Sequence, residues 1–318
     1  MMKKLIAFVS IALLMIAGLL GYQNRQFIKD WYVVNTKQQQ SEATAVASSL
    51  ELTDEGNFLF KASQPKILPA VEFNEACKAV DKELTIVLGC YTAQRFYVFQ
   101  VDDSRLQGVE EVTAAHELLH SVYERLPQND KDVLNREIQL ASNAITDPHF
   151  VELVEQYKKS EPAELDNEIH SIIGTEIAVL PKVLEDHYGK YFKNRSKIVE
   201  FSKSYQSVFK ENSDKIESYD AKLKELKSEI EDIESELQDL EKELSLKQAE
   251  LARLRSQDTS LYNAQVPVFN AMVSEYNLRV GQAKTLTTQY NQVVERRNEI
   301  AILQTDLSQQ LDSNFQTR

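Results

Sequence analysis

The sequence is poor in the residues that interrupt helices. It contains eight glycines and seven prolines among 318 residues, about a third to a half of their usual frequency. Their distribution is uneven, because residues 190–266 contain neither type and residues 268–318 contain a single glycine. This scarcity argues against a loop-rich β-sandwich, a collagen-like repeat or a low-complexity chain. We therefore expect the C-terminal third of the chain to be helical with few breaks.

Cysteine and positive charge are also scarce. Two cysteines, Cys77 and Cys90, exclude a disulfide-dense scaffold and a cysteine-rich zinc module, but they can form one bridge. Outside the cytoplasm a bridge is favoured over two free thiols. The chain has 36 basic and 49 acidic residues, so its net charge is −13. This balance offers no basic surface to phosphate groups, and we expect no binding to nucleic acid.

One long apolar run lies near the N-terminus. Residues 5–22 carry no charge, follow Lys3 and Lys4, and are long enough to cross a bilayer as a helix. The small residues that precede a cleavage site are poorly matched around Gly21, so an uncleaved anchor is favoured over a cleaved signal peptide. The positive flank predicts a cytoplasmic N-terminus and a single pass through the cell membrane, with the bulk of the chain outside the cytoplasm.

The C-terminal part of the chain has the repeat of a coiled coil. Apolar residues from Ile216 to Leu254 alternate steps of three and four, as heptads require. Residues 255–267 interrupt the pattern, and a weaker heptad repeat follows. An antiparallel helical hairpin is the simplest arrangement, and an intermolecular coil is the alternative. The expected segments are 1–22, a cytoplasmic N-terminus and transmembrane signal anchor; 23–49, a polar and partly helical spacer; 50–195, a folded domain; and 196–318, the coiled-coil hairpin.

The folded domain has the pattern of an α+β fold. A β-hairpin is expected at residues 50–60, around the turn residue Gly56. β-Branched and aromatic residues predict strands at 84–88 and 96–101. Apolar spacing and the positions of proline predict three helices. These helices are 108–126, 164–180, and one that begins near Lys182 and merges into the coil.

The helix over 108–126 carries the pattern His-Glu-X-X-His at His116, Glu117 and His120. Residues four apart share one helix face, so both imidazoles can reach a single ion at about 2.0–2.1 Å. The Glu117 carboxylate can approach a water on that ion without binding the ion itself. The alternative is a pair of ordinary core histidines. Two buried histidines and an acid without a cation would leave several polar groups to be partnered, which favours a metal site.

A third protein ligand is expected on the helix over 164–180. Glu168 and Glu176 share the apolar face of this helix, whereas His170 lies on the other side of a helical wheel. A carboxylate on an apolar face needs a charge to meet, and a zinc ion would supply it. Glu168 is the favoured ligand, with Glu176 and then His170 as alternatives.

The two histidines, followed 48 residues later by Glu168, resemble the gluzincin branch of the zincin metallopeptidases. The flanking residues 112–115 and 174–176 resemble exported bacterial proteins of the same kind. The resemblance covers roughly residues 50–195, and it implies a small zincin-like domain in which a sheet packs on the motif helix and a second helix supplies the glutamate. In many gluzincins an aspartate follows that glutamate by four residues, but this chain has Ile172 there.

The resemblance implies a membrane-anchored zinc metallopeptidase that cleaves peptide or protein substrates outside the cytoplasm. One Zn²⁺ is expected on His116, His120 and Glu168, with Glu117 as the general base for an attacking water. The candidates for stabilising the oxyanion are His170, His187 and Tyr188. The alternative function is scaffolding, in which the coiled coil binds a protein partner or a second copy and the zincin-like domain is inactive or structural. A metal site alone does not exclude a hydrolase of another bond.

Overall fold

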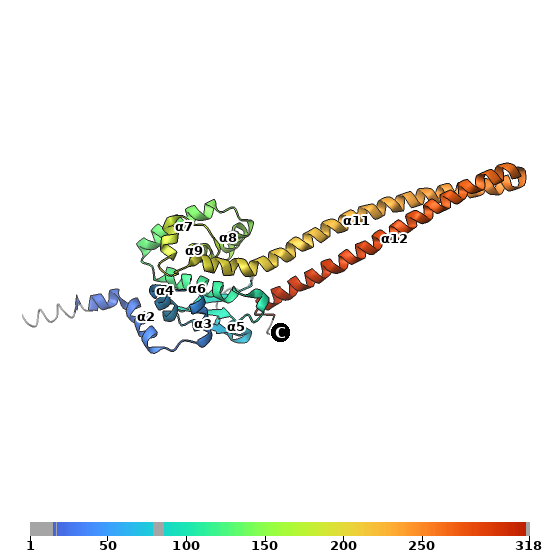
Figure 1. Ribbon diagram of the computed structural model, residues 1–318. Helices are drawn as coiled ribbons and strands as arrows, with labels where there is room; N and C mark the ends of the chain where they lie inside the picture. Colours follow the sequence, from blue (N-terminus) through green and yellow to red (C-terminus); the bar gives the residue numbers. More distant parts are fainter. Residues whose placement is uncertain (1–14, 17, 79–85, 316–318) are drawn as a thin grey trace, which may run out of the picture. The chain divides into compact units, whose positions relative to one another are not determined.

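The computed structural model of the chain describes residues 15, 16, 18–78 and 86–315. This part is mostly helical, with a small sheet and two long helices that pack together (Figure 1). It divides into two compact units, one extending to Val208 and including the segment from Leu307 onward, the other covering Phe209–Asp306. The expectation of helices, a small sheet and a long helical pair is confirmed at this coarse level.

Most elements belong to the first unit. Its helices are α2 (Arg25–Thr36), α3 (Ser41–Ser49), α4 (Asp54–Ala62), α5 (Ala70–Ala76), α6 (Val109–Arg125), α7 (Gln128–Ala144), α8 (Pro148–Ser160), α9 (Leu165–Glu176) and α10 (Lys182–Tyr188). Its strands are β1 (Lys66–Leu68), β2 (Gly89–Thr92) and β3 (Arg95–Phe99). A short 3-10 helix, η1, covers Ser104–Leu106. The long helices are α11 (Arg195–Gln257) and α12 (Thr259–Leu311).

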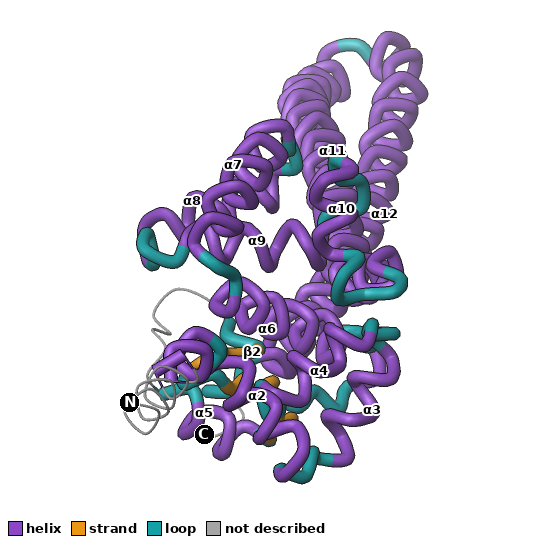
Figure 2. The backbone as a smooth tube through the Cα atoms, turned by 90° about the vertical axis from the view of Figure 1, so that its left-hand side faces the viewer, coloured by secondary structure: helices purple, strands orange, loops and turns teal. Residues whose placement is uncertain are grey.

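Helix α6 is the central element of the first unit. It contacts β2 and β3 of the sheet, α3 and α4, and the helix α9, and Figure 2 shows it between the elements of the sheet layer and the layer of α7, α8 and α9. Its apolar face is fully buried, and small residues let the neighbouring elements approach closely. That face includes Ala114, Ala115, Leu118, Leu119 and Val122. Burying each larger side chain contributes about 1.5–3 kcal/mol, so α6 is firmly held on both sides.

The strands lie in the order β1-β3-β2 among the described residues, with β1 parallel and β2 antiparallel to β3. Ala93 and Gln94 form the turn between β2 and β3, with φ of 50° and 64°, as in two-residue type I′ hairpins. These turn residues lack the Asn-Gly pair that usually signals such a turn. The predicted strand at 84–88 is wrong. Residues 84 and 85 lie outside the described part, and 86–88 precede the strand, which begins at Gly89.

The β-hairpin expected at residues 50–60 is also wrong, because this segment forms α4. The hydroxyl of Thr53 accepts a hydrogen bond from the Gly56 amide (3.0 Å) and caps the helix. Gly56 is needed for close packing, since a Cβ there would lie 2.1 Å from the carbonyl oxygen of Tyr191. The burial of Phe60 completes the attachment of α4 to the core.

Residues 23–49, expected to be a spacer, fold as α2 and α3 in the first unit. Ala43 and Val46 are buried in the main core together with Leu50. These positions are three and four residues apart, which places them on one face of α3 against α6. The polar composition of the segment concealed this stripe because its apolar residues are small.

The long helices differ from the expected course at two places. Helix α10 does not merge into the coil, because it ends at Tyr188 and α11 begins at Arg195. The expected break over 255–267 is confined to Asp258, whose carboxylate accepts a hydrogen bond from the Leu261 amide (2.9 Å). Pro267 lies inside α12. A helix tolerates such a proline at the cost of one backbone hydrogen bond.

Helices α11 and α12 form a hairpin within the second unit. Ion pairs join Arg297 to Asp220 (3.0 Å) and Arg279 to Glu236 (3.1 Å) across the two helices. Both pairs are nearly equidistant in sequence from Asp258, as an antiparallel arrangement requires. The heptad seam is therefore filled by the chain itself.

The disulfide between Cys77 and Cys90 is present, as the sequence predicted. It joins the end of α5 to β2. Phe73, Phe99 and Leu68 surround it in a small second core.

The predicted membrane anchor, residues 5–22, lies mostly outside the described residues. No helix formed by the described residues is long and apolar enough to cross a membrane. Residues 18–23 are helical and continue into α2, because the amide of Asn24 donates to the carbonyl of Leu20 (3.0 Å) and the amide of Ile28 donates to that of Asn24 (2.9 Å).

Candidate metal centre

Helix α6 presents the three motif residues to one side of the first unit. Gly108 precedes the helix with φ of 94°, a left-handed conformation that favours glycine. A Cβ at Gly108 would also lie 3.0 Å from the backbone of Phe201. The close packing of Gly108 at the start of α6 and the buried apolar face of α6 fix the rotation of this helix about its axis. His120 and Glu117 are consequently buried, at 6% and 5% exposure, on the side that faces α9 and β2.

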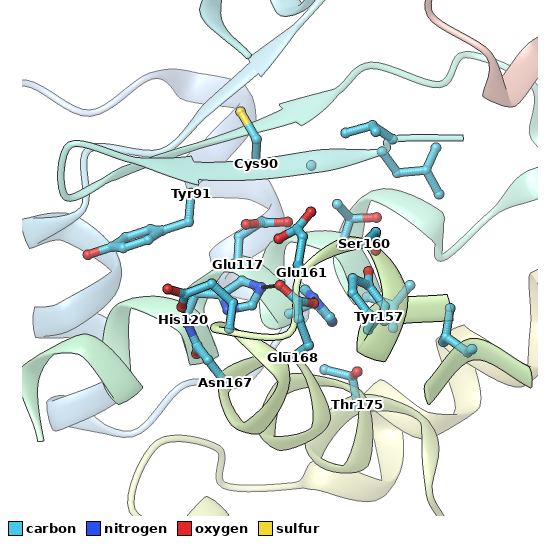
Figure 3. A pocket seen from close by; sticks show the side chains of 18 of the residues that line it. Cys90, Tyr91, Glu117, His120, Tyr157, Ser160, Glu161, Asn167, Glu168 and Thr175 are labelled. Carbon is cyan, nitrogen blue, oxygen red and sulfur yellow. Dashed lines mark hydrogen bonds and ion pairs between the residues drawn. The ribbon is translucent and has the colours of Figure 1, made fainter. Parts of the chain in front are cut away.

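Helix α9 brings Glu168 to the two histidines. The Nε2 atom of His116 lies 3.5 Å from one Glu168 oxygen, and the Nε2 atom of His120 lies 3.4 Å from the other. The three ligand atoms all lie within 4.8 Å of one another. Figure 3 shows Glu168 beside His120 and Glu117 below the strand that contains Tyr91. The structure thus brings together the three residues that the sequence analysis favoured as ligands.

The two alternative ligands lie elsewhere. Glu176, two turns further along α9, accepts a hydrogen bond from the side chain of Gln206 (3.1 Å). His170 is fully buried, and its Nε2 lies 2.9 Å from Nε2 of His187. Neither residue joins the cluster of His116 and Glu168.

The geometry of the cluster fits a zinc ion. A tetrahedral ion with bonds of about 2.0–2.1 Å holds its ligand atoms roughly 3.4 Å apart. Each histidine lies at about this distance from a different oxygen of Glu168, and the three candidate ligand atoms lie within 4.8 Å of one another. Two imidazoles and one carboxylate are a usual protein donor set for catalytic zinc, which leaves a fourth position open. The hydroxyl of Ser171 lies 3.4 Å from Nδ1 of His120, where a second polar group can orient the ring.

The carboxyl group of Glu117 is held in a dry position next to the cluster. Burial raises its pKa to about 8, with an opposing effect of His120 and a further rise from Glu168. Strand β2 approaches this carboxyl closely, because a Cβ at Gly89 would lie 2.5 Å from Oε1 of Glu117 and 2.6 Å from Cγ2 of Thr113. Glycine at position 89 therefore makes room for the side chain of Glu117.

Glu168 stays ionised although it is buried. Burial alone would raise the pKa of this carboxyl, but electrostatic attraction to His120 and His116 and hydrogen bonds from His116 and Tyr157 lower it below its usual value. A negative carboxylate between two imidazoles is the charge state that a cation requires.

Tyr157 on α8 is a site residue that the sequence analysis missed. Its hydroxyl hydrogen-bonds Glu168, and its ring lines the same cleft (Figure 3). Helix α8 was not expected, although Asp147 and Pro148 form a clear start signal. The Asp147 carboxylate accepts a hydrogen bond from the Phe150 amide (3.0 Å), and Pro148 occupies the first turn.

The three expected oxyanion stabilisers are buried next to the cluster but do not line the cleft. The hydroxyl of Tyr188 donates to the backbone carbonyl of His170 (2.7 Å), and the rings of His170, His187 and Tyr188 pack on one another. Burial lowers the pKa of His187 to about 4 and holds that of His170 well below its usual value. These three uncharged side chains pack together between α9 and α10.

A cleft of about 1000 Å³ opens above the cluster. Residues 86–94, which comprise β2 and the residues on both sides of it, line one side, and residues of α8 and α9 line the other. His116, Glu117, His120 and Glu168 all lie in its lining. The cleft is large enough for an extended peptide segment to reach the cluster.

Comparisons of the chain with models of protein families, with curated proteins and with solved structures find no match.

Proposed function

We propose that the chain is a zinc-dependent metallopeptidase of the zincin type. The observation that carries this proposal is the convergence of His116, His120 and Glu168, whose candidate ligand atoms all lie within 4.8 Å of one another, with each histidine 3.4–3.5 Å from a Glu168 oxygen. An acid, Glu117, adjoins this cluster without belonging to it. Structural zinc sites are usually closed by four protein ligands, so a three-ligand cluster at the base of a cleft favours catalysis.

The surrounding fold supports the same proposal. A sheet packs on the motif helix α6, and a second helix, α9, supplies the glutamate, as the resemblance to gluzincins implies. Ile172 replaces the aspartate that many members have, and the ligands are instead contacted by the polar groups of Ser171 and Tyr157. These two residues take over the orientation of His120 and Glu168.

The residues of the chain have distinct roles in peptide hydrolysis. A zinc ion, when bound, polarises the scissile carbonyl and makes water more acidic. A cation held beside Glu117 would lower the pKa of its buried carboxyl. The ionised carboxylate accepts the proton of the attacking water and delivers it to the leaving amine. Strand β2 lines the cleft and pairs through one side with β3, so its other side can hydrogen-bond an extended substrate.

The membrane anchor predicted from residues 5–22 is part of the proposal. With the N-terminus in the cytoplasm, the first unit and its disulfide lie outside the cytoplasm, where a bridge between Cys77 and Cys90 persists. We therefore propose a single-pass protein of the cell membrane that acts on extracytoplasmic peptides or proteins.

The decisive test measures zinc and proteolysis in the purified full chain. Glu117→Gln is expected to retain one zinc per chain and to lose cleavage of an unfolded fluorescent protein, whereas His116→Ala loses both. Glu168→Gln is expected to lose zinc, and Glu176→Gln, a matched change on the same helix, is expected to keep it. Equal cleavage by wild type and Glu117→Gln would refute the peptidase, and a zinc-free wild type would refute the metal centre.

The scaffolding alternative makes a different prediction for the second unit. Residues 209–306 form a hairpin whose seam is filled within the chain. Replacing this segment with a short linker is expected to leave zinc content and cleavage intact if the first unit is the enzyme. Loss of the cellular function with intact cleavage would instead assign that function to the hairpin.

A further inference from the structure

Helix α2 exposes a cluster of large apolar side chains. Phe27, Ile28, Trp31 and Tyr32 are 60%, 52%, 54% and 57% exposed. Their spacing of one, three and four residues gathers them on one side of the helix. Single exposed apolar residues are common, but four within six positions form a patch that indicates contact with another phase or molecule.

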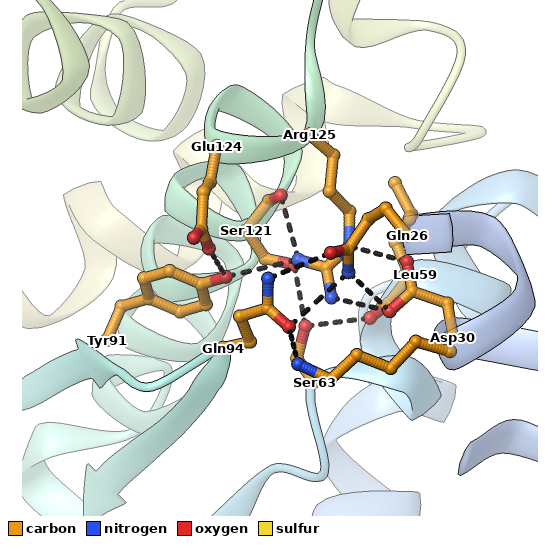
Figure 4. A network of polar contacts seen from close by, with 10 residues as sticks. Gln26, Asp30, Leu59, Ser63, Tyr91, Gln94, Ser121, Glu124 and Arg125 are labelled. Carbon is orange, nitrogen blue, oxygen red and sulfur yellow. Dashed lines mark hydrogen bonds and ion pairs between the residues drawn. The ribbon is translucent and has the colours of Figure 1, made fainter. Parts of the chain in front are cut away.

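The opposite side of α2 is attached to the first unit by polar groups. Asp30 is 4% exposed and accepts hydrogen bonds from Nε and Nη2 of Arg125 (2.9 and 3.0 Å), the last residue of α6. Gln26 donates to Asp30 (3.0 Å) and accepts from Gln94 (3.0 Å) at the hairpin turn. Figure 4 shows this network between α2, α6 and the turn. Phe27, at the edge of the patch, also stacks on Phe58 of α4 (ring centroids 5.9 Å apart). Ile28, Trp31 and Tyr32 lie on the outward side because the polar side is anchored.

We propose that the apolar face of α2 lies in the interfacial region of a lipid bilayer and orients the metal centre relative to the membrane surface. The uncharged run of residues 5–22 ends three residues before α2, and the helix at residues 18–23 continues into α2 through Asn24. Tryptophan and tyrosine are the side chains that concentrate at the boundary between hydrocarbon and water.

The residues around the patch suit the same environment. Arg25 lies over the ring of Tyr22 (4.6 Å), and both remain exposed. At the boundary between a bilayer and water, a cation beside an aromatic ring can contact lipid phosphate while the ring stays among the headgroups.

The ion pair between Asp30 and Arg125 transmits this contact to the site. Arg125 ends the helix that carries His116 and His120, and it also donates to the hydroxyl of Ser121 (2.6 Å). A bilayer that fixes the rotation of α2 consequently fixes α6 and the cleft. This membrane contact rests on the anchor included in the proposed function, and it limits substrates to segments that lie near the membrane.

Trp31 provides the test because it is the single tryptophan of the chain. The full chain is reconstituted into phosphatidylcholine vesicles with and without brominated acyl chains, and Trp31 fluorescence is measured. The matched control is Trp31→Phe combined with Val179→Trp, which moves the indole to a position that is 87% exposed and outside α2. We expect a blue-shifted emission and loss of at least half of the intensity with bromolipid for Trp31, and neither effect for the control.

Two results would overturn the membrane contact. Bromolipid quenching no greater than in the control, with free access of iodide to Trp31, would place α2 in water. The same weak quenching with Trp31 shielded from iodide would place a protein surface, such as a second copy, over the patch. Flotation of the chain with the vesicles reports the anchor separately, and zinc content and proteolysis report the peptidase. A failed peptidase therefore leaves the fluorescence result interpretable, whereas a chain that does not float loses both anchor and contact.

Discussion

Asp30 and Arg125 form a two-point ion pair that joins α2 to the end of α6, the helix that carries His116 and His120. The side chains of both residues are less than a tenth exposed, and each end of the carboxylate accepts one guanidinium N–H. Bidentate pairs of this kind are stronger and more directional than single contacts.

Breaking this pair is expected to destabilise the first unit. Asp30→Asn leaves the Arg125 guanidinium buried without its counter-charge, which costs about 3–5 kcal/mol. The exposed pair of Lys182 and Asp186 is the control, and Asp186→Asn is expected to cost less than about 0.5 kcal/mol. Hydrogen exchange of α6 amides during urea unfolding of the full chain measures both changes. Equal protection of the two variants would contradict the structural role of Asp30.

Gly89 is expected to be essential for activity without being a ligand. In Gly89→Ala the added methyl meets the Glu117 carboxylate at 2.5 Å, so either that carboxylate or β2 must move. Displacement of a catalytic group by about 1 Å can lower the rate about 100-fold. The zinc content is expected to stay unchanged because the ligands lie on α6 and α9. Cleavage of the unfolded substrate measures the loss.

The control for this change is Gly281→Ala in the second unit. A Cβ at Gly281 meets nothing within 4 Å, and the residue lies inside α12. Alanine in a helix interior is more stable than glycine by about 0.5–1 kcal/mol. This variant is therefore expected to unfold at a higher urea concentration than wild type and to cleave the substrate normally. Normal cleavage by Gly89→Ala as well would show that β2 does not constrain Glu117.

Tyr157 is expected to strengthen metal binding through Glu168. Removing the hydroxyl in Tyr157→Phe keeps the ring but deletes the hydrogen bond that helps to lower the pKa of the Glu168 carboxyl. Outer groups of this kind change metal affinity by about 10- to 100-fold, so the variant should release zinc at a lower chelator concentration. Competition with a zinc-binding dye measures the affinity, and an unchanged affinity would exclude the role of Tyr157.

The stability of the first unit is expected to fall as the pH is lowered from 6.5 towards 4. Burial depresses the pKa of His187 from 6.5 to about 4 in the folded chain, so between these values the unfolded chain binds more protons. The contribution of neutral His187 to the free energy of unfolding is therefore fully present above pH 6.5. Below this pH the free energy of unfolding falls by up to about 1.4 kcal/mol per pH unit. Urea midpoints at pH 7 and 5 are expected to differ less in His187→Gln than in wild type. His149→Gln, at an exposed histidine, should keep the wild-type difference.

The helices that carry the site were predictable because their patterns are long. The motif helix and α9 were expected at 108–126 and 164–180 and run over Val109–Arg125 and Leu165–Glu176. A run of apolar residues at spacings of three and four over four turns has few alternatives. The distinction between Glu168 and Glu176 needed the structure, since both occupy one face and only packing decides which turn of α9 reaches His116.

The wrong or missed predictions concern short segments whose conformation depends on tertiary contacts. Gly56 suggested a turn, but it permits α4 to approach the backbone of Tyr191. Ala93 and Gln94 adopt positive φ without the residues that usually signal it. The role of Tyr157 depends on the placement of α8 against α9. Local composition does not encode these relationships, because each depends on how the element packs in the folded chain.

The bridge between Cys77 and Cys90 lies directly beside the strand residue that faces the general base. Cys90 follows Gly89, so oxidation of the two thiols ties the start of β2 to α5. In a reducing compartment this tether is absent, and the strand that lines the cleft is held by its pairing with β3 and its contacts with α6. For the proposed exported peptidase, this arrangement would couple completion of the cleft to the redox conditions met outside the cytoplasm, so that the chain would be less active while it is still in the cytoplasm.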